Sequence, residues 1–216
     1  MRKLYAISDI HGCYDQLIRL LDLLPTLGPE DKLIFLGDYI DRGPKSYEVI
    51  QHLLQLPKES TIFLKGNHED LLIEYIEGSY EAYECWMRNG GGETIKSYNK
   101  ATGCGDMESE FHLPQEHLDF YRNLILFYET DNYFFVHAGL NPYKSLADQT
   151  KDDLMWIRDP FILSNKLPTT RRVIFGHTPL KKPLVRANKI GIDTCCFLTG
   201  RLTALELPTV KFYTTT

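Results

Sequence analysis

The residues of this sequence that could do chemistry are acids, histidines and one asparagine that follow short apolar runs. Seven such residues follow five runs: Asp9, His11, Asp38, Asn67, His68, His137 and His177. Carboxylate, imidazole and amide groups together suit manganese, iron or zinc, and no thiolate is needed. Metal ions in such a site lower the pKa of bound water, so that hydroxide is available near neutral pH. The residue types therefore predict a metal-dependent site.

A structural role is the alternative for each of these residues. Asp9 and His11 would equally suit a capped turn into a helix, and one histidine after a strand is more often structural than ligating. The same form recurs five times, however, each time with a glycine nearby: Gly12, Gly37, Gly66, Gly139 and Gly176. Glycine lets the backbone turn sharply and approach a bound group closely. The repetition favours a shared site over independent structural roles.

Parallel strands are the elements that can bring these residues together. Apolar runs at 3–8, 32–37 and 60–66 alternate with segments of helical leucine spacing at 13–24 and 46–56. This βαβαβ order predicts an α/β fold with helices on the faces of a parallel sheet. Open sheets of this class bind ligands beyond the carboxyl ends of their strands, which is where the polar residues lie.

The middle of the chain predicts a helical insertion. Residues from about 70 to 123 contain three helical runs, and the glycine-rich stretch 89–106 between them is loop-like. We interpret 70–123 as a helical cap over the sheet edge, within a single domain of 1–216. The elements expected after it are two β segments joined by a turn at Asp131 and Asn132, a strand before His177, a β-hairpin pair in 189–207 and an edge strand in 210–216.

The composition is that of an ordinary globular protein. Of the 216 residues 43% are apolar and 25% charged, enough for one sizeable core. The formal net charge of −5 gives no reason to expect binding to nucleic acid or to a membrane surface. The first apolar stretch breaks at Ser8 and Asp9, and no run approaches the roughly 20 residues of a membrane-spanning helix. The five cysteines form no CxxC pair, so we expect reduced thiols and a cytoplasmic protein.

Five motifs, DIHG, GDYIDRG, GNHE, HAG and GHT, resemble those of the phosphoprotein phosphatase family of binuclear metallophosphoesterases. Within that family the chain resembles the bacterial and phage-type serine/threonine protein phosphatases. The resemblance implies an αββα sandwich of two mixed β-sheets flanked by helices, with a helical cap insertion. One departure from the family pattern lies near the end, where Cys195 and Thr199 stand in place of glycines.

The resemblance also implies two divalent metal ions about 3.5–4 Å apart, bridged by water or hydroxide. Manganese is expected, with iron and zinc as alternatives. Asp38 would bridge both ions. The ligands of the first ion would be Asp9, His11 and Asp38, and those of the second would be Asp38, Asn67, His137 and His177.

Four further residues receive roles through the same resemblance. His68 would protonate the leaving oxygen, and Asp41 would hold its imidazolium. Arg42 and Arg158 would grip phosphate oxygens, because a guanidinium can make two parallel hydrogen bonds to phosphate. The alternatives are a helix cap for His68, a surface turn for Arg42 and an ion pair with Asp159 for Arg158.

The stretch WMRNGGGET (86–94) has no clear role in the sequence. It lacks the GxxxxGK[ST] spacing of a phosphate-binding loop. A hinge in the cap is one interpretation, and Asn89 could touch substrate. The other histidines, His52, His112 and His117, are expected to be solvated or packed.

The predicted function is metal-dependent hydrolysis of a phosphomonoester, with a phosphorylated protein or peptide as partner and a monomeric chain. The resemblance leaves two alternatives open, a symmetrical bis(5'-nucleosyl)-tetraphosphatase and a broad-specificity small phosphatase. Tetraphosphatases of that branch typically lack an acid at Asp41, carry Asp instead of Glu69 and are longer, which favours a serine/threonine protein phosphatase. A scaffold that has lost its metals is disfavoured because every ligand is kept.

Overall fold

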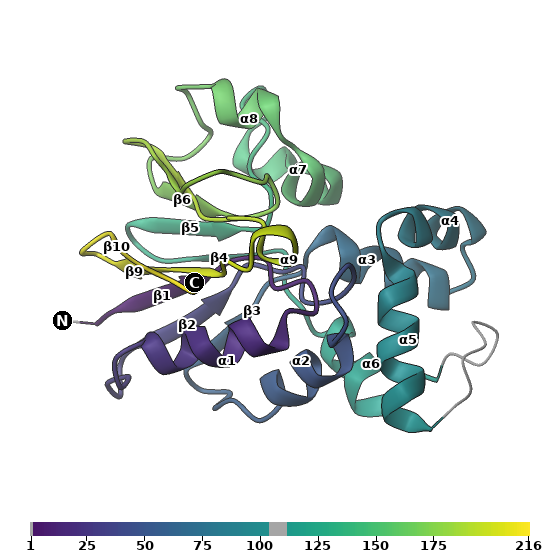
Figure 1. Ribbon diagram of the computed structural model, residues 1–216. Coiled ribbons are helices and arrows are strands. Elements are labelled where there is room, and N and C mark those ends of the chain that lie inside the picture. The colour runs from purple at the N-terminus through teal and green to yellow at the C-terminus, as the bar shows by residue number, and fades with distance from the viewer. Residues whose placement is uncertain (1, 104–111) are drawn as a thin grey trace.

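Two five-stranded β-sheets form the centre of the protein (Figure 1), whose computed structural model describes residues 2–103 and 112–216. The first sheet has the order β10 (Lys211–Thr214), β9 (Thr203–Leu207), β1 (Leu4–Ile7), β2 (Lys32–Phe35) and β3 (Thr61–Phe63). The second has the order β4 (Phe127–Glu129), β5 (Tyr133–Val136), β6 (Arg172–Phe175), β8 (Lys189–Gly191) and β7 (Leu184–Val185).

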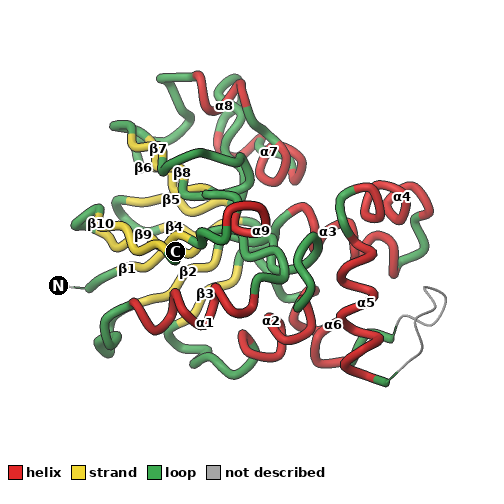
Figure 2. Tube along the Cα trace, in the orientation of Figure 1, coloured by secondary structure: helices red, strands yellow, loops and turns green. Residues whose placement is uncertain are grey.

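Helices cover both outer faces, which confirms the expected αββα arrangement of two mixed sheets (Figures 1 and 2). The first sheet is covered by α1 (Tyr14–Leu23) and α2 (Ser46–Leu53), and the second by α7 (Lys151–Trp156) and α8 (Asp159–Leu163). Beside the sheets lie α3 (Asn67–Ile76), α4 (Tyr80–Arg88), α5 (Gly91–Thr102) and α6 (Gln115–Arg122). The short helix α9 (Cys196–Thr199) precedes β9.

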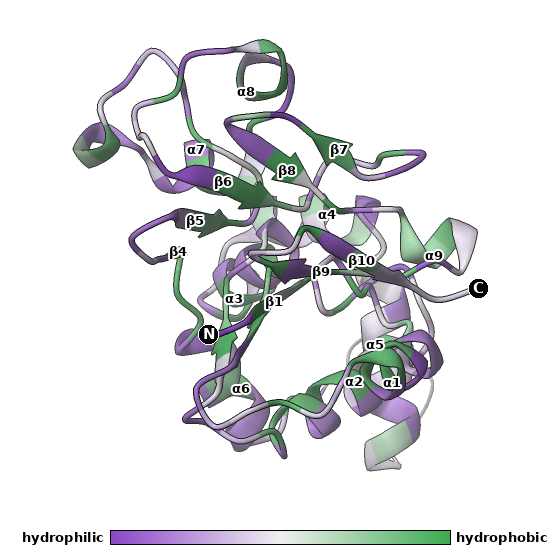
Figure 3. Cartoon of the chain, turned by 90° about the vertical axis from the view of Figure 1, so that its left-hand side faces the viewer, coloured by the Kyte–Doolittle hydropathy of each residue, from purple (hydrophilic) through white to green (hydrophobic). Residues whose placement is uncertain are grey.

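The side chains of each strand alternate between two cores. Ala6 of β1 and Ile34 of β2 point between the sheets, where they meet Ile174 and Ile190 of the second sheet. Tyr5, by contrast, packs with the leucines of α1 on the outer face. Since strand residues alternate in direction, a run that is apolar at every position has apolar neighbours on both sides. Figure 3 shows β5 and β6 as hydrophobic toward their carboxyl ends.

Strand direction sets the place of the site. β1, β2 and β3 are parallel to one another, and so are β5, β6 and β8. The carboxyl ends of these strands therefore lie at one edge of each sheet, and the polar loops that follow them gather there.

Two sequence-based predictions about local structure are wrong. The stretch 89–106 is not loop throughout, because α5 occupies 91–102, and residues 104–106 lie outside the described part. The stretch 189–207 is not a hairpin, because β8 pairs with β6 while β9 pairs antiparallel with β1 in the other sheet. The expected edge strand in the tail is confirmed as β10, which pairs with β9.

Among residues 2–103 and 112–216, no helix has both the length and the apolar character needed to cross a bilayer. Four cysteines in these ranges are free thiols, Cys13, Cys85, Cys195 and Cys196.

Candidate active site

Seven predicted site residues meet at the edge where the strands end. Each of them is at most 5% exposed: Asp9, His11, Asp38, Asn67, His68, His137 and His177. They come from the loops after β1, β2, β5 and β6 and from the start of α3. Segments more than 160 residues apart in sequence thus join directly, since the backbone N–H of His177 donates to both carboxylate oxygens of Asp9 at 3.1 and 2.9 Å.

Two groups of side chains have the geometry to hold a cation. His11, Asp38 and His68 form one group, and Asp38, His137 and His177 the other; within each, the potential ligand atoms lie within 4.8 Å of one another. Asp38 belongs to both groups, which is the place expected of a bridging ligand. Asn67 lies next to the second group, because its Oδ1 is 3.1 Å from His137 Nε2.

Hydrogen bonds to backbone carbonyls fix the orientation of two imidazoles. His11 Nδ1 lies 2.9 Å from the carbonyl of Ile40, and His137 Nδ1 lies 2.7 Å from that of Leu36. In each ring Nε2 then faces Asp38, at 3.5 Å from His11 and 3.4 Å from His137. Metal-binding histidines commonly donate their other ring N–H to a carbonyl or carboxylate in this way. The two rings therefore have the support that ligation requires.

Burial and neighbouring charges shift the pKa values of several site residues. Burial raises the pKa of Asp9 well above its usual value, and the nearby Asp193 adds to the effect. Burial also lowers the pKa of His11 to about 3. It would lower the pKa of His137 as well, but the Asp38 carboxylate raises that pKa to about 9. Buried carboxylate and imidazole groups gathered in this way are a donor set that divalent cations bind, so the residues present fit such ions.

The backbone of the site adopts conformations that are rare for residues with side chains. His11, Asp38 and His177 have φ of 48°, 53° and 59°, in the left-handed region. Such backbone strain clusters at functional sites. Two glycines are also required by space, because a Cβ on Gly66 or Gly176 would lie 2.1 Å from a carboxylate oxygen of Asp38 or Asp9, respectively.

His68 and Asp41 form a buried pair beside the first group. His68 Nδ1 donates to Asp41 Oδ2 at 2.6 Å, and Asp41 is fully buried. Burial would lower the pKa of His68, but the Asp38 and Asp41 carboxylates raise it above its usual value. This arrangement suits an imidazolium that gives up a proton from Nε2.

The two predicted phosphate-binding arginines lie against different groups of the site. Arg42 Nη2 lies 3.2 Å from His68 Nε2, and the Arg42 guanidinium lies 4.8 Å from the ring centre of Phe197 in α9. Arg158 Nε donates to His177 Nε2 at 3.1 Å. Arg158 thus contacts a predicted metal ligand, and among the described residues no ion pair with Asp159 accompanies it.

This geometry agrees with the comparison to protein families. The pattern of the calcineurin-like phosphoesterases matches residues 2–206. The chain belongs to the calcineurin-like phosphoesterase family. It is therefore an enzyme of the metallophosphoesterase class, and the expectation of a metal-dependent phosphoester hydrolase is correct at this level.

Several relatives carry names that concern nucleotides. The chain is 27% identical to the asymmetrical bis(5'-nucleosyl)-tetraphosphatase PrpE of Halalkalibacterium halodurans, over 95% of this chain and 90% of that protein. It is 30% identical to a symmetrical bis(5'-nucleosyl)-tetraphosphatase of Nitrosomonas europaea, over 81% of this chain but 58% of that protein. These names agree better with a bis(5'-nucleosyl)-tetraphosphatase, the alternative that the sequence left open, than with a serine/threonine protein phosphatase.

Solved structures of two phosphatases share the fold. A crystal structure described as that of a candidate diadenosine tetraphosphatase has a TM-score of 0.73 at 21% identity, covering 99% of this chain and 92% of that one. A cold-active protein tyrosine phosphatase has a TM-score of 0.69 at 18% identity, covering 95% of this chain and 74% of that one. At these identities the likeness concerns the fold alone.

Two acids of the phosphoesterase site escaped the sequence-based selection. Asp193 follows β8 and is buried, and burial raises its pKa to about 6. It fits the pattern of a polar residue after a parallel strand, which could have identified it. Glu69 is buried at the start of α3, and its carboxylate accepts from the backbone N–H groups of Tyr39 at 2.7 Å and Asp38 at 3.0 Å. Glu69 therefore joins the loop after β2 to α3.

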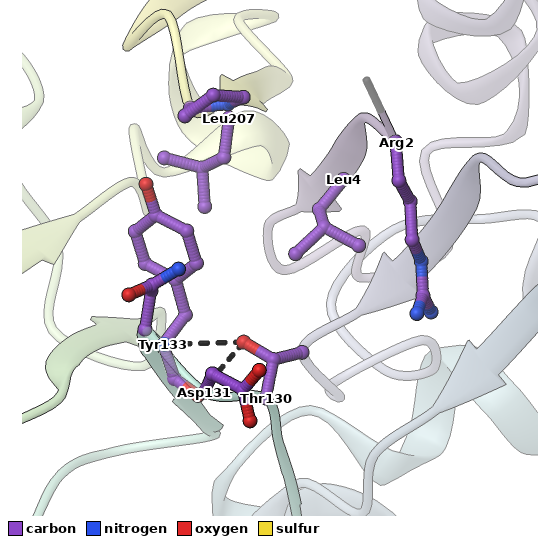
Figure 4. A pocket seen from close by; sticks show the side chains of 8 residues that line it. Arg2, Leu4, Thr130, Asp131, Tyr133 and Leu207 are labelled. Carbon is purple, nitrogen blue, oxygen red and sulfur yellow. Dashed lines mark hydrogen bonds between the residues drawn. The ribbon is translucent and has the colours of Figure 1, made fainter.

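A cavity of about 440 Å³ lies at the opposite edge of the sheets (Figure 4). It is lined by Leu4 and Tyr133, the first residues of β1 and β5, and by Leu207, the last residue of the antiparallel β9. The site lies beyond the other ends of β1 and β5, so this cavity is separate from it.

Metal removal should destabilise this phosphoesterase. A ligand at about 100 times its Kd stabilises a folded protein by about 2.7 kcal/mol per site. For a chain of this size that corresponds to a change in Tm of roughly 5–10 °C. We expect chelation followed by gel filtration to lower Tm by this amount and added Mn²⁺ to restore it, as measured by differential scanning fluorimetry. An equal Mn²⁺-dependent shift in Asp38→Asn would contradict the assignment.

Substitution of Arg42 should weaken phosphate binding. Lysine keeps the charge but loses the planar fork, and a charged hydrogen bond contributes about 1.5–3 kcal/mol. We expect Arg42→Lys to lower kcat/KM by about 10- to 100-fold, mainly through KM. Arg19→Lys, at an exposed position of α1, is the matched control and should behave as wild type. An unchanged KM in Arg42→Lys would count against a phosphate-binding role.

Proposed function

We propose that this protein hydrolyses dinucleoside tetraphosphates and cleaves them asymmetrically. Chain length supports this choice, because the asymmetrical relative from Halalkalibacterium halodurans is covered over 90% of its length, whereas the symmetrical relative is covered over 58%. The greater length of symmetrical tetraphosphatases was an argument against a nucleotide substrate. That argument does not apply to the asymmetrical tetraphosphatases.

Chemistry at the site supports the same substrate class. Arg42 lies beside one ligand group and Arg158 beside the other, so two guanidinium groups flank the centre. A chain of phosphates carries several negative charges in a row, and each guanidinium can bind a different phosphate by paired hydrogen bonds. This distribution of positive charge is the observation on which the proposal depends.

The proposed reaction needs two cations, and the predicted ligands are the residues that would hold them. Asp9, a buried carboxylate that accepts from the backbone N–H of His177, would join His11 and Asp38 in holding one cation. Asp38 would share the second with Asn67, His137 and His177. We propose Mn²⁺ as the metal, since the donors are oxygen and nitrogen atoms without thiolate. When bound, the two cations would lower the pKa of water at the site and neutralise charge on the phosphate.

Product analysis tests the proposal. We expect the Mn²⁺-loaded protein to convert diadenosine tetraphosphate to AMP and ATP, separated by ion-exchange chromatography. Two equivalents of ADP would show symmetrical cleavage and contradict the asymmetrical assignment. Absence of any nucleotide product, together with release of phosphate from a phosphoserine peptide, would contradict the substrate class.

Serine/threonine protein phosphatase activity is the second candidate, and one observation favours it. The His68–Asp41 pair is built to donate a proton, which matters most when the leaving group is a serine or threonine alkoxide. A nucleotide leaving group is far more acidic and needs this help less. Comparing kcat/KM for the phosphopeptide and the tetraphosphate distinguishes the two candidates.

A further inference from the structure

The α4–α5 hairpin contacts the proton-donating pair, although the sequence suggested only a hinge there. Trp86 of α4 donates from Nε1 to both carboxylate oxygens of Asp41, at 3.0 and 2.9 Å. Thr94 of α5 donates from its hydroxyl to Asp41 Oδ1 at 2.6 Å. Trp86, Thr94 and Asp41 are all fully buried. Three hydrogen-bond donors, including His68, thus surround one carboxylate.

The glycines of the NGGG stretch explain how the hairpin reaches Asp41. Gly90 has φ of 103°, a left-handed conformation that glycine adopts without strain. A Cβ on Gly91 would lie 2.5 Å from the Trp86 indole, so only glycine lets the start of α5 lie against that ring. Thr94 follows one turn later on the same helix. The glycines therefore serve close packing of α5 on Trp86.

The other contacts of Trp86 hold the indole in place. Its ring stacks on Tyr75 of α3, with ring centres 5.5 Å apart and an angle of 24°. α3 also begins with the segment that carries His68. α3 therefore carries His68 and, through Tyr75, also supports the indole that binds Asp41.

We propose that Trp86 and Thr94 are positioning residues that orient Asp41, and through it His68, for proton transfer to leaving groups of low acidity. The inference rests on the proposed phosphoester hydrolysis. It concerns the same site and explains which leaving groups that site accepts. The oxygen of the attacking water forms a bond to phosphorus as the bond from phosphorus to the leaving oxygen breaks, and the electron pair of the broken bond stays on the leaving oxygen. The proton on His68 Nε2 moves to the oxygen, and the proton released by the attacking water restores His68. A misdirected carboxylate would weaken this transfer.

The test compares two leaving groups in conservative variants. Trp86→Phe removes the indole N–H but keeps an aromatic ring, and Thr94→Val removes the hydroxyl. We expect each to lower kcat/KM for phenyl phosphate about 10-fold more than for p-nitrophenyl phosphate, whose leaving group needs little protonation. Thr94→Ser keeps the donor and should retain the wild-type ratio. The fall for diadenosine tetraphosphate should be smaller than for phenyl phosphate.

A double-mutant cycle separates positioning from folding. In a His68→Asn background, Trp86→Phe should no longer alter the ratio between the two aryl phosphates, because the proton donor is absent. Equal falls for both substrates, an effect that persists without His68, or no hydrolysis of either aryl phosphate by the wild type would overturn the inference. Failure of tetraphosphate hydrolysis with the ratio changed as expected would overturn only the proposed function.

Discussion

Replacing Asp38 by asparagine should abolish metal-dependent hydrolysis. Asp38 is the one residue shared by both ligand groups, so its carboxylate is the charge on which both cation sites depend. Loss of several kcal/mol of electrostatic stabilisation corresponds to a fall in kcat/KM of about 10³-fold or more. Metal analysis after gel filtration should show less than the wild-type content of Mn²⁺ per chain.

Asparagine is the appropriate replacement because the fold tolerates it. Asp38 has φ of 53°, a conformation that asparagine adopts more readily than most residues. Its Oδ1 accepts a hydrogen bond from the backbone N–H of His68 at 3.2 Å, and the amide oxygen of asparagine can do the same. Asp22→Asn, exposed on α1, is the matched control. Full metal content and activity in Asp38→Asn would show that the two groups do not hold the catalytic metals.

Replacing His68 by asparagine should slow hydrolysis without removing the metals. His68 lies in the first ligand group, but its Nδ1 donates to Asp41 and its Nε2 lies 3.2 Å from Arg42 Nη2. General acid catalysis contributes about 10²–10⁴-fold, so kcat for phenyl phosphate should fall by that factor. The fall for p-nitrophenyl phosphate should be smaller because its leaving group is more acidic.

Metal content decides between the two roles open to His68. If the variant keeps both cations and loses kcat, His68 donates a proton; if it loses a cation, His68 is a ligand. Asp41→Asn should resemble His68→Asn, because the imidazolium loses its counter-charge. His112→Asn, at an exposed position, is the control that should leave kcat unchanged.

Substrate preference shows the limit of motif-based interpretation. The five motifs identified the family, since each places a ligand and a glycine next to a strand end. They did not identify the substrate, because nucleotide and protein substrates present the same phosphate to the same ligands. Asp41 and Glu69 were interpreted as marks of a protein phosphatase, but relatives of matching length have tetraphosphatase names.

The fold class and the residues that meet at the site could be predicted from the sequence alone. Alternating apolar runs specify parallel strands, and parallel strands bring the residues after their carboxyl ends together. Only the tertiary structure decided that Trp86 and Thr94 hold Asp41, across 45 and 53 residues, and that β8 and β9 belong to different sheets. The reason is physical: strands and turns follow from local periodicity, whereas a hydrogen bond between distant segments depends on how helices pack, which no spacing in the sequence records.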